Sequence, residues 1–423
     1  MNRCLRSICI VFCIQIIPAV CQCADGIGIS EYLSTAAKNA ALSFEKESLT
    51  FLQNAGNRSL LEEVEFRVAV DEFERDQQEV AIRFKSRGWS QIRDEKKFNE
   101  AVLQSHRAHH DLLMHQALKN RYITVIDWLY HAEMLHLYAD LIHLYEDLVQ
   151  VLKKSAGMSD MDPVKLSSEL MNTENDLLRV QMEEAELKNR LHFITEEIRR
   201  NTGAQGLISL DAEKLITPEK IGKKASEIAA APAEENAAVR NARTETELAN
   251  ARYDLEKSKN SAWSTFIETA YDLSEKDETD KAFSIEFGIS LPIGAVNSPE
   301  MKARKTDGIK AKAEYEILHE QRKQSIPALA AELAQLIHHY DVLKQKKQSG
   351  ASQSLYKLWQ KTEGADPLLL LRLRESMIKC DITAKKLIWL IQAKYVELLD
   401  ISGRLSELPL RNHLSNEKEQ IAL

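Results

Sequence analysis

Two regions of the chain alternate between apolar and polar residues, and each predicts a β-hairpin. Along residues 62–90 every second position is mostly apolar, and the positions between are mostly charged. The same alternation returns along residues 262–294, which include the stretch FSIEFGISLPIG. A period of two places successive side chains on opposite faces of a strand, so each hairpin should have one apolar and one polar face. The apolar-face positions are Val64, Phe66, Val68, Val70, Val80, Ile82, Phe84, Ile267, Tyr271, Phe283, Ile285, Phe287, Ile289 and Leu291.

Most of the remaining chain has the 3.6-residue periodicity of long helices. Between Asp94 and Ser155 there is no glycine or proline. A helix of roughly 60 residues with a rise of 1.5 Å per residue would be on the order of 90 Å long. Further helices are predicted over 164–200, 218–260, 299–362 and 368–401. The fold class is therefore mainly α, with a small β part.

The landmarks of the chain occur twice, about 200 residues apart. Each half contains a helix, a hairpin, a very long helix, a break and a shorter helix. The breaks at 156–164 and 362–368 both have a glycine followed by Asp-Pro, and we call them the tips. A repeat with a long period is stronger evidence of architecture than any local motif. It predicts structural repeats at 25–205 and 206–410, followed by a flexible tail at 411–423.

The N-terminus has the pattern of a secretory signal peptide, which we place at residues 1–24. Arg3 and Arg6 precede a short apolar run, and small residues follow it. The run is too short for a transmembrane helix. Five of the six cysteines lie in or beside this segment, so the mature chain would keep only Cys380 and form no internal disulfide. Lipidation of Cys21 or Cys23 is left open.

Composition and motifs exclude several classes of function. A net charge of −8 argues against nucleic acid as a partner. No other segment approaches the length of a membrane-spanning helix. The sequence has no phosphate-binding loop, no G-x-S-x-G and no H-E-x-x-H motif. We therefore expect a protein that is not an enzyme and has no cofactor.

The apolar faces of the hairpins need a partner, and two arrangements can supply one. In a soluble sandwich they would pack against each other. In a membrane barrel they would face lipid, and strands of about ten tilted residues have the length that a bilayer requires. Four strands are too few to close a barrel, but three chains of four would give twelve strands without a free edge. Trp89 and Trp263 lie at strand ends, where interfacial aromatics are found.

Several segments together resemble the outer membrane efflux protein (TolC) family. They are Phe283–Gly294 followed by SPEMKARKTDGIKAKAEYE, the segment AKYVELLDISGRLSELPL, and the Gly and Asp-Pro pattern of both tips. The first hairpin departs from the family because it ends in RFKSRGW, without a Leu-Pro run. The resemblance implies a homotrimer in the outer membrane of a Gram-negative bacterium, with a twelve-stranded barrel on a periplasmic coiled-coil tunnel. It also implies a periplasmic adaptor and an inner-membrane pump as partners.

The tips are the main candidate site. The resemblance implies that they dock the adaptor and that Asp162 and Asp366 help to hold the tunnel closed. The alternative is that each aspartate simply caps the helix that follows it. The candidate tip residues are Gly157, Asp160, Asp162, Val164, Gly364, Asp366 and Leu368.

Histidines offer a second, weaker hypothesis. His106 and His110 are four residues apart on one predicted helix face, a spacing at which two histidines can share a metal ion. The alternative is a solvated helix face. Two E-x-x-H motifs, at Glu133 and Glu316, are typical of di-iron bundles, but their separation does not match the repeat.

The sequence thus favours a passive export channel. The competing hypothesis is a periplasmic or secreted coiled-coil scaffold without transport activity. The cargo is not identified by any motif.

Overall fold

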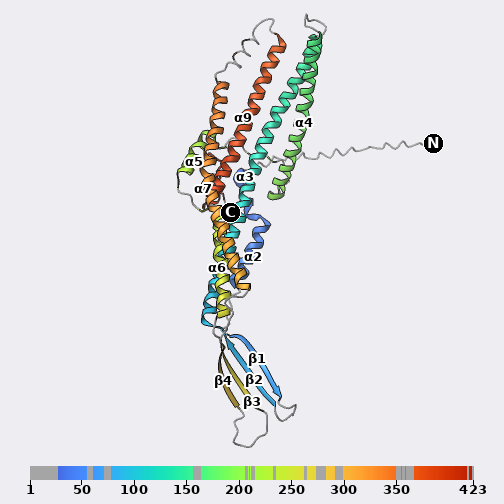
Figure 1. The fold of residues 1–423 in the computed structure, drawn as a ribbon. Helices are drawn as coiled ribbons and strands as arrows, with labels where there is room; N and C mark the ends of the chain where they lie inside the picture. Colours follow the sequence, from blue (N-terminus) through green and yellow to red (C-terminus); the bar gives the residue numbers. More distant parts are fainter. Residues whose placement is uncertain are drawn as a thin grey trace, which may run out of the picture.

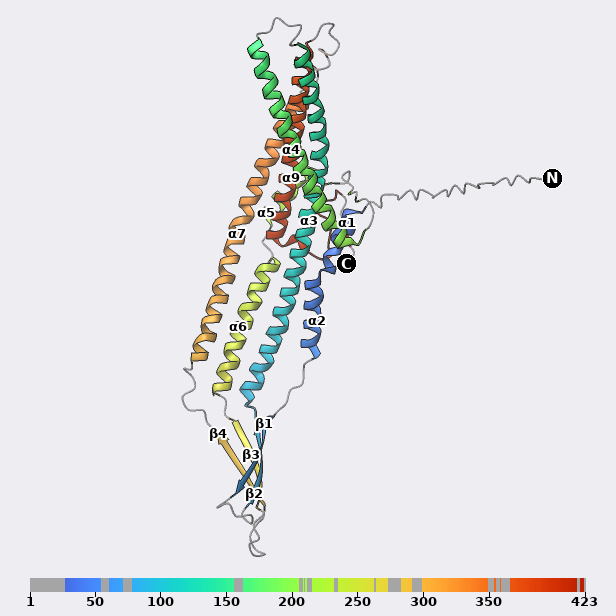
Figure 2. The same ribbon diagram turned by 90° about the vertical axis from the view of Figure 1, so that its right-hand side faces the viewer.

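The computed structural model shows an elongated molecule with a small sheet at one end and long helices along the rest (Figures 1 and 2). Helix α1 (Ile29–Ser34), the first element of the described chain, lies near the middle of its length (Figure 2). The described residues are 27–54, 61–70, 78–155, 163–204, 208, 210, 215–231, 235–261, 264–272, 283–290, 299–348, 354, 358, 366–416 and 419–421. The predicted signal peptide, with Cys21 and Cys23, lies outside them.

The two halves of the chain contain the same succession of elements. The first half has α1 (Ile29–Ser34), η1 (Thr35–Lys38), α2 (Ala40–Asn54), β1 (Leu61–Val70), β2 (Gln78–Ser86), α3 (Trp89–Ser155) and α4 (Pro163–Thr202). The second half has α5 (Pro218–Ala230), α6 (Ala237–Ser261), β3 (Ser264–Asp272), β4 (Phe283–Ser290), α7 (Pro299–Gln348), α9 (Pro367–Ser402) and η3 (Arg404–Ser406). In each half a hairpin precedes the longest helix, as the repeat predicted.

The two hairpins join into one antiparallel sheet in the order β1-β2-β3-β4. Strands β2 and β3 are neighbours in the sheet although they are far apart in the sequence. Phe84 pairs with Val64 on one side and with Ile267 on the other, and Ile267 pairs in turn with Phe287. This register places the predicted apolar positions of both hairpins on the same face.

The helices form a bundle in which α3 and α7 are the two longest members. Helix α3 packs against α4, α6 and α9, and α7 packs against α6 and α9. The main core lies near mid-length, around Tyr32, Tyr122 and Tyr395, all of which are fully buried or nearly so. A second, smaller core lies toward the tips and contains Leu141, Leu144, Tyr145, Leu148, Val180 and Ile378.

Two predictions about local structure were wrong. The predicted helix 218–260 is two helices, α5 and α6, because Ala231 is extended (φ −78°, ψ 149°). Ala231 precedes Pro232, and a residue before proline is driven out of the helical conformation. Asn236 then starts α6, since its side-chain oxygen accepts a hydrogen bond from the Val239 N–H at 2.9 Å.

The C-terminal segment was predicted to be a flexible tail, but its described residues pack against the main core. Leu414 is fully buried. The Asn412 N–H donates to the Glu419 carbonyl at 2.8 Å, and the Ile421 N–H donates to the Leu410 carbonyl at 2.9 Å. Apolar side chains at 410, 414 and 421 supply the buried surface that holds this segment in place.

Among the described residues, no helix has a stretch both long and apolar enough to cross a membrane. In the same part of the chain Cys380 is a free thiol.

Candidate functional site

The sheet presents a continuous apolar face to its surroundings. Three rows cross all four strands, and the central one joins Val64, Phe84, Ile267 and Phe287. Phe66 and Phe287 each have 73% of their surface exposed, although they are large apolar residues. Exposed apolar patches of this kind mark contact with a partner or a membrane. The predicted face residues Val64, Phe66, Val68, Val80, Ile82, Phe84, Ile267, Tyr271, Phe283, Ile285, Phe287 and Ile289 all lie on it.

For two of the positions predicted on the apolar face, Val70 and Leu291, the structure describes no side chain. Val70 is the last residue of β1 and pairs with Gln78 across the hairpin. Leu291 lies outside the described residues. Trp89, predicted at an interface, begins α3 next to the sheet and is 87% exposed, whereas Trp263 lies outside the described residues.

The opposite face of the sheet carries charged side chains, and some of its carboxylates are paired with arginines. Glu65, Arg83, Glu268 and Glu286 form a row across the four strands. The Arg83 Nε donates to the Glu268 carboxylate at 2.5 Å, and Arg67 lies 3.9 Å from the same carboxylate. The Arg83 and Glu268 side chains are only 23% and 12% exposed, whereas those of Arg67 and Glu65 are 42% and 41% exposed. Glu286 is exposed as well, so this face meets water along its outer strands.

An aromatic contact on the charged face was not predicted from the sequence. The ring of Phe266 lies directly over Gly288, where an added Cβ would come within 2.0 Å of the ring. The Arg83 guanidinium lies 4.3 Å from the centre of the same ring, in a cation–π contact. The alternation of β3 already assigned Phe266 to the polar side, but only the strand pairing shows that Gly288 makes room for it.

The sheet has two open edges, β1 and β4. In a four-stranded meander the first and last strands run in opposite directions, so β1 and β4 are antiparallel to each other. The edge backbone groups have no strand beside them within the described chain. An edge of this kind is a template for pairing with a strand of another chain.

At the tip of the second half, Asp366 caps α9. Its side chain accepts a hydrogen bond from the Leu368 N–H at 3.0 Å, and Pro367 occupies the first turn of the helix. This is the capping role that was weighed against a gate. At this same tip, Leu368 packs against the smaller core. At the tip of the first half, Val164 in the first turn of α4 is 76% exposed. The candidates Gly157, Asp160, Asp162 and Gly364 lie outside the described residues.

A charged cluster links three helices below the tips. Glu375 on α9 is only 7% exposed, and it accepts hydrogen bonds from Tyr145 at 2.8 Å, Arg372 at 2.8 Å and Lys379 at 2.6 Å. Arg372 also reaches Glu169 on α4 at 3.1 Å. Burial alone would raise the pKa of Glu375, but the three donors outweigh it and lower the pKa. This cluster was not predicted from the sequence, because the spacing of these charges on α9 is that of a solvated face.

The histidine candidates are not brought together with a third ligand. The Nδ1 atom of His106 lies 2.5 Å from Glu45, and that of His110 lies 3.8 Å from Asp111. Over the described part of the chain, no three His, Cys, Asp or Glu side chains are arranged to hold a metal ion. Glu133 of the first E-x-x-H motif forms an ion pair with Lys385 at 2.7 Å.

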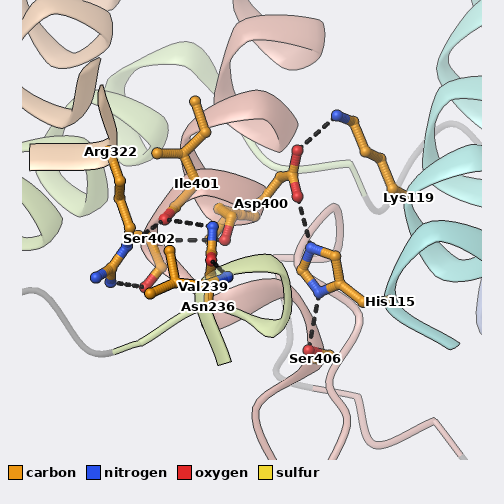
Figure 3. Close-up of polar contacts among 10 residues, drawn as sticks. His115, Lys119, Asn236, Val239, Arg322, Asp400, Ile401, Ser402 and Ser406 are labelled. Atoms are coloured by element: carbon orange, nitrogen blue, oxygen red, sulfur yellow. Dashed lines mark hydrogen bonds and ion pairs between the residues drawn. The ribbon is translucent and has the colours of Figure 1, made fainter. Parts of the chain in front are cut away.

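A polar clamp holds the end of α9 against three other helices (Figure 3). The Arg322 side chain on α7 donates to the Ile401 carbonyl at 2.8 Å and to the Ser402 carbonyl at 3.2 Å. Asn236, at the start of α6, donates to the same Ile401 carbonyl at 3.3 Å. Gly403 has a left-handed conformation (φ 84°), and its added Cβ would lie 3.1 Å from Asn236. Glycine therefore suits both the conformation and the close packing at this position.

The same helix end also contacts α3. The Asp400 carboxylate is 2.5 Å from the Nε2 atom of His115 and 2.5 Å from the Lys119 ammonium group. The Nδ1 atom of His115 lies 2.9 Å from the Ser406 hydroxyl. Burial raises the pKa of Asp400, but the hydrogen bonds from His115 and Lys119 exceed that effect and lower it. These contacts stabilise the junction of α3, α6, α7 and α9.

The chain combines a long helical bundle with a small sheet at one end, and one face of that sheet is apolar. Several solved structures have the same arrangement. No protein-family model matches the sequence, and no curated protein matches it. The outer membrane protein VceC of Vibrio cholerae is similar over 89% of this chain and 96% of its own, with 13% identity and a TM-score of 0.61. The Campylobacter jejuni CmeC outer membrane channel is similar over 89% and 85%, with 10% identity and a TM-score of 0.60.

A third similar structure is that of the Neisseria gonorrhoeae MtrE outer membrane channel in its open state. It matches 89% of this chain and 89% of its own, with 13% identity and a TM-score of 0.57. At these identities the likeness concerns the fold. The chain thus has the fold of the outer membrane efflux (TolC) family, as the sequence segments predicted.

Proposed function

We propose that this chain is one protomer of a trimeric outer-membrane channel, a passive conduit for export. The observation that carries the proposal is the four-stranded sheet, which has one exposed apolar face, one charged face and two open edges. Water cannot stabilise a large exposed apolar face, whereas the hydrocarbon of a bilayer can. The charged face would then line an aqueous lumen.

The sheet geometry supports closure by several chains. Edge β4 of one copy can pair with edge β1 of the next, because the two strands run antiparallel. Three copies of four strands make twelve, and every edge is then paired, as a lipid-exposed sheet requires. The strand lengths of eight to ten residues agree with tilted membrane strands.

The helices support the tunnel part of the proposal. Helix α3 has 67 residues and would be about 100 Å long at 1.5 Å per residue. A helix of this length, next to a membrane sheet, would extend far into the periplasm. The tips at its far end are the surfaces we propose for the periplasmic adaptor, with Val164 and Leu368 among the contacts, and an inner-membrane pump would supply the cargo. The signal peptide at residues 1–24 would direct export of the chain across the inner membrane.

The solved structures add support by analogy. CmeC and MtrE are described as outer membrane channels. No enzymatic role is proposed, and the fold requires no cofactor for a passive conduit. The scaffold hypothesis explains the long helices equally well, but it leaves the apolar face of the sheet exposed to water.

The first experiment is fractionation of the native host, followed by extraction in mild detergent and mass determination of the purified complex. We expect an outer-membrane particle with the mass of three protomers, and single-channel conductance after reconstitution into bilayers. A soluble monomer or dimer in the periplasmic fraction would contradict the channel and favour the scaffold.

A further inference from the structure

A cavity near the middle of the molecule lies apart from the sheet and the tips. It has a volume of about 160 Å³, opens to solvent, and is lined by residues of α5, the last turns of α9, η3 and the C-terminal segment. A water molecule occupies about 30 Å³ of liquid, so the space is enough for a small ligand. Two of the elements that line it were predicted differently from the sequence. Helix α5 was expected to be part of one longer helix, and the C-terminal segment was expected to be a flexible tail.

Cations from three elements line this cavity. They are Lys224 on α5, Arg404 in η3 and Arg411 in the C-terminal segment. Arg404 is half-buried and Arg411 is exposed. Neither guanidinium group takes part in an ion pair within the described chain, although most arginines there do. Their planar donor groups, which suit carboxylate and phosphate, are therefore available to a ligand.

Two carboxylates, Glu227 and Glu407, also line the cavity. In the described part of the chain neither forms an ion pair with Arg404 or Arg411. Three cations and two carboxylates line the cavity, so the net charge of these five side chains is positive. The carboxylates limit this charge, which favours a ligand with one anionic group over a multiply charged one.

A tyrosine hydroxyl in the cavity wall has no protein partner. The Tyr395 side chain is 1% exposed, and no hydrogen bond to its hydroxyl is found over the described residues. The hydroxyl is not among the fully buried atoms that lack a partner, so it is accessible from the cavity. A ligand oxygen in the cavity would accept a hydrogen bond from it.

The pKa of His413, which also lines the cavity, reflects the positive charges around it. Burial, followed by the nearby charge of Lys224, lowers the pKa of His413 to about 4. A hydrogen bond with the Arg404 backbone opposes this shift, and the charges of Arg411 and Arg404 add to it. His413 is therefore neutral at pH 7 and adds no charge to the cavity wall.

We propose that this cavity binds a small oxyanion, a carboxylate or a phosphate, between the guanidinium groups of Arg404 and Arg411 and the hydroxyl of Tyr395. A bound anion would connect α5 to the C-terminal segment and to the end of α9. It would therefore stabilise the middle of the molecule. This binding does not depend on the proposed channel function.

The test uses the full-length purified protein with sodium phosphate and sodium acetate as probes. Sodium chloride keeps the ionic strength constant in every sample. Calorimetry and thermal unfolding should both show saturable binding of at least one probe. R404Q/R411Q should weaken it by about tenfold or more, since it removes the charge-assisted hydrogen bonds that both guanidinium groups would donate to the anion. Y395F, which removes only the hydroxyl group, should weaken it by a smaller factor.

A matched control is R179Q/R190Q, which removes the same charge from exposed positions on α4. It should leave the affinity unchanged. Binding by phosphate alone or by acetate alone identifies the chemistry of the ligand, and either result supports the site. The proposal is overturned if neither probe binds beyond the effect of chloride, or if the control weakens binding as much as R404Q/R411Q. If R404Q/R411Q does not fold, an unchanged affinity in Y395F overturns it.

Discussion

At the scale of single residues, the environment of a side chain decides which of several possible roles it takes. Asp366 was a candidate for both a helix cap and a gate. The structure shows the cap, because its carboxylate accepts a hydrogen bond from the backbone of α9. The gate depends on copies of the chain beyond this one and stays a proposal.

Two substitutions at Asp366 separate the roles. D366A removes the cap and should lower the free energy of unfolding by about 1 kcal/mol, measured by chemical denaturation. D366N keeps a good capping side chain but removes the charge, so it should leave stability nearly unchanged. If the aspartate also gates the tunnel, D366N should raise the resting conductance of the reconstituted protein. A conductance equal to that of the wild-type protein would contradict the gating role and leave helix capping as the role of Asp366.

His413 predicts a dependence of stability on pH. Its pKa is about 4 in the folded chain and about 6.5 when unfolded, so between these values the unfolded chain binds the extra proton. Stability should therefore be complete above about pH 6.5 and fall as the pH decreases toward 4, by about 3 kcal/mol. Denaturation curves at several pH values measure this. H413Q should show a shallower decline, and an identical slope in both proteins would refute the assignment.

At the scale of elements, the sheet shows how much a local pattern can predict. Alternation assigned a set of apolar positions in the two hairpins to one face, and the strand register places those with described side chains on one face of the sheet. The helix break at Ala231 was missed although Pro232 gives a clear signal. The break was missed because the apolar residues keep a helical spacing both before and after Pro232.

Neighbouring residues on β4 test which face of the sheet meets lipid. F287K places a charge on the apolar face, which in a bilayer should cost about 2–4 kcal/mol near the midplane. We expect it to reduce the amount of protein in the outer membrane several-fold, measured by immunoblotting of membrane fractions. E286K changes the adjacent residue on the charged face and should leave the amount nearly unchanged. Equal effects of the two substitutions would argue against a lipid-facing sheet.

At the scale of the whole molecule, contacts between segments far apart in the sequence hold the helices of the bundle together. Arg322 on α7 is nearly fully buried and donates to the last carbonyls of α9. A cation at the C-terminal end of a helix is favourable, because the free carbonyls carry partial negative charge. The clamp around Ile401 thus joins α6, α7 and α9 at one point.

R322M should therefore destabilise the whole protein. It leaves the carbonyls of Ile401 and Ser402 without this donor, at an expected cost of about 2–3 kcal/mol. Thermal unfolding of the purified protein should show a lower midpoint. R304M, on the same helix, removes an exposed arginine that is 3.7 Å from Asp307 and should change stability by less than about 0.5 kcal/mol. Similar midpoints for the two variants would mean that the clamp contributes little.

The sequence alone determined the elements of this protein and their order. Strand faces, the very long helix α3 and the duplicated succession follow from periodicity and from the scarcity of glycine and proline, which are properties of neighbouring residues. The exact boundaries of the two repeats stay a prediction. Only the tertiary structure decided that the hairpins pair through β2 and β3, that Gly288 accommodates Phe266, and that Glu375 is buried among three donors. It also decided that the C-terminal segment is packed. These features depend on residues far apart in the chain, and no local pattern encodes which of them meet.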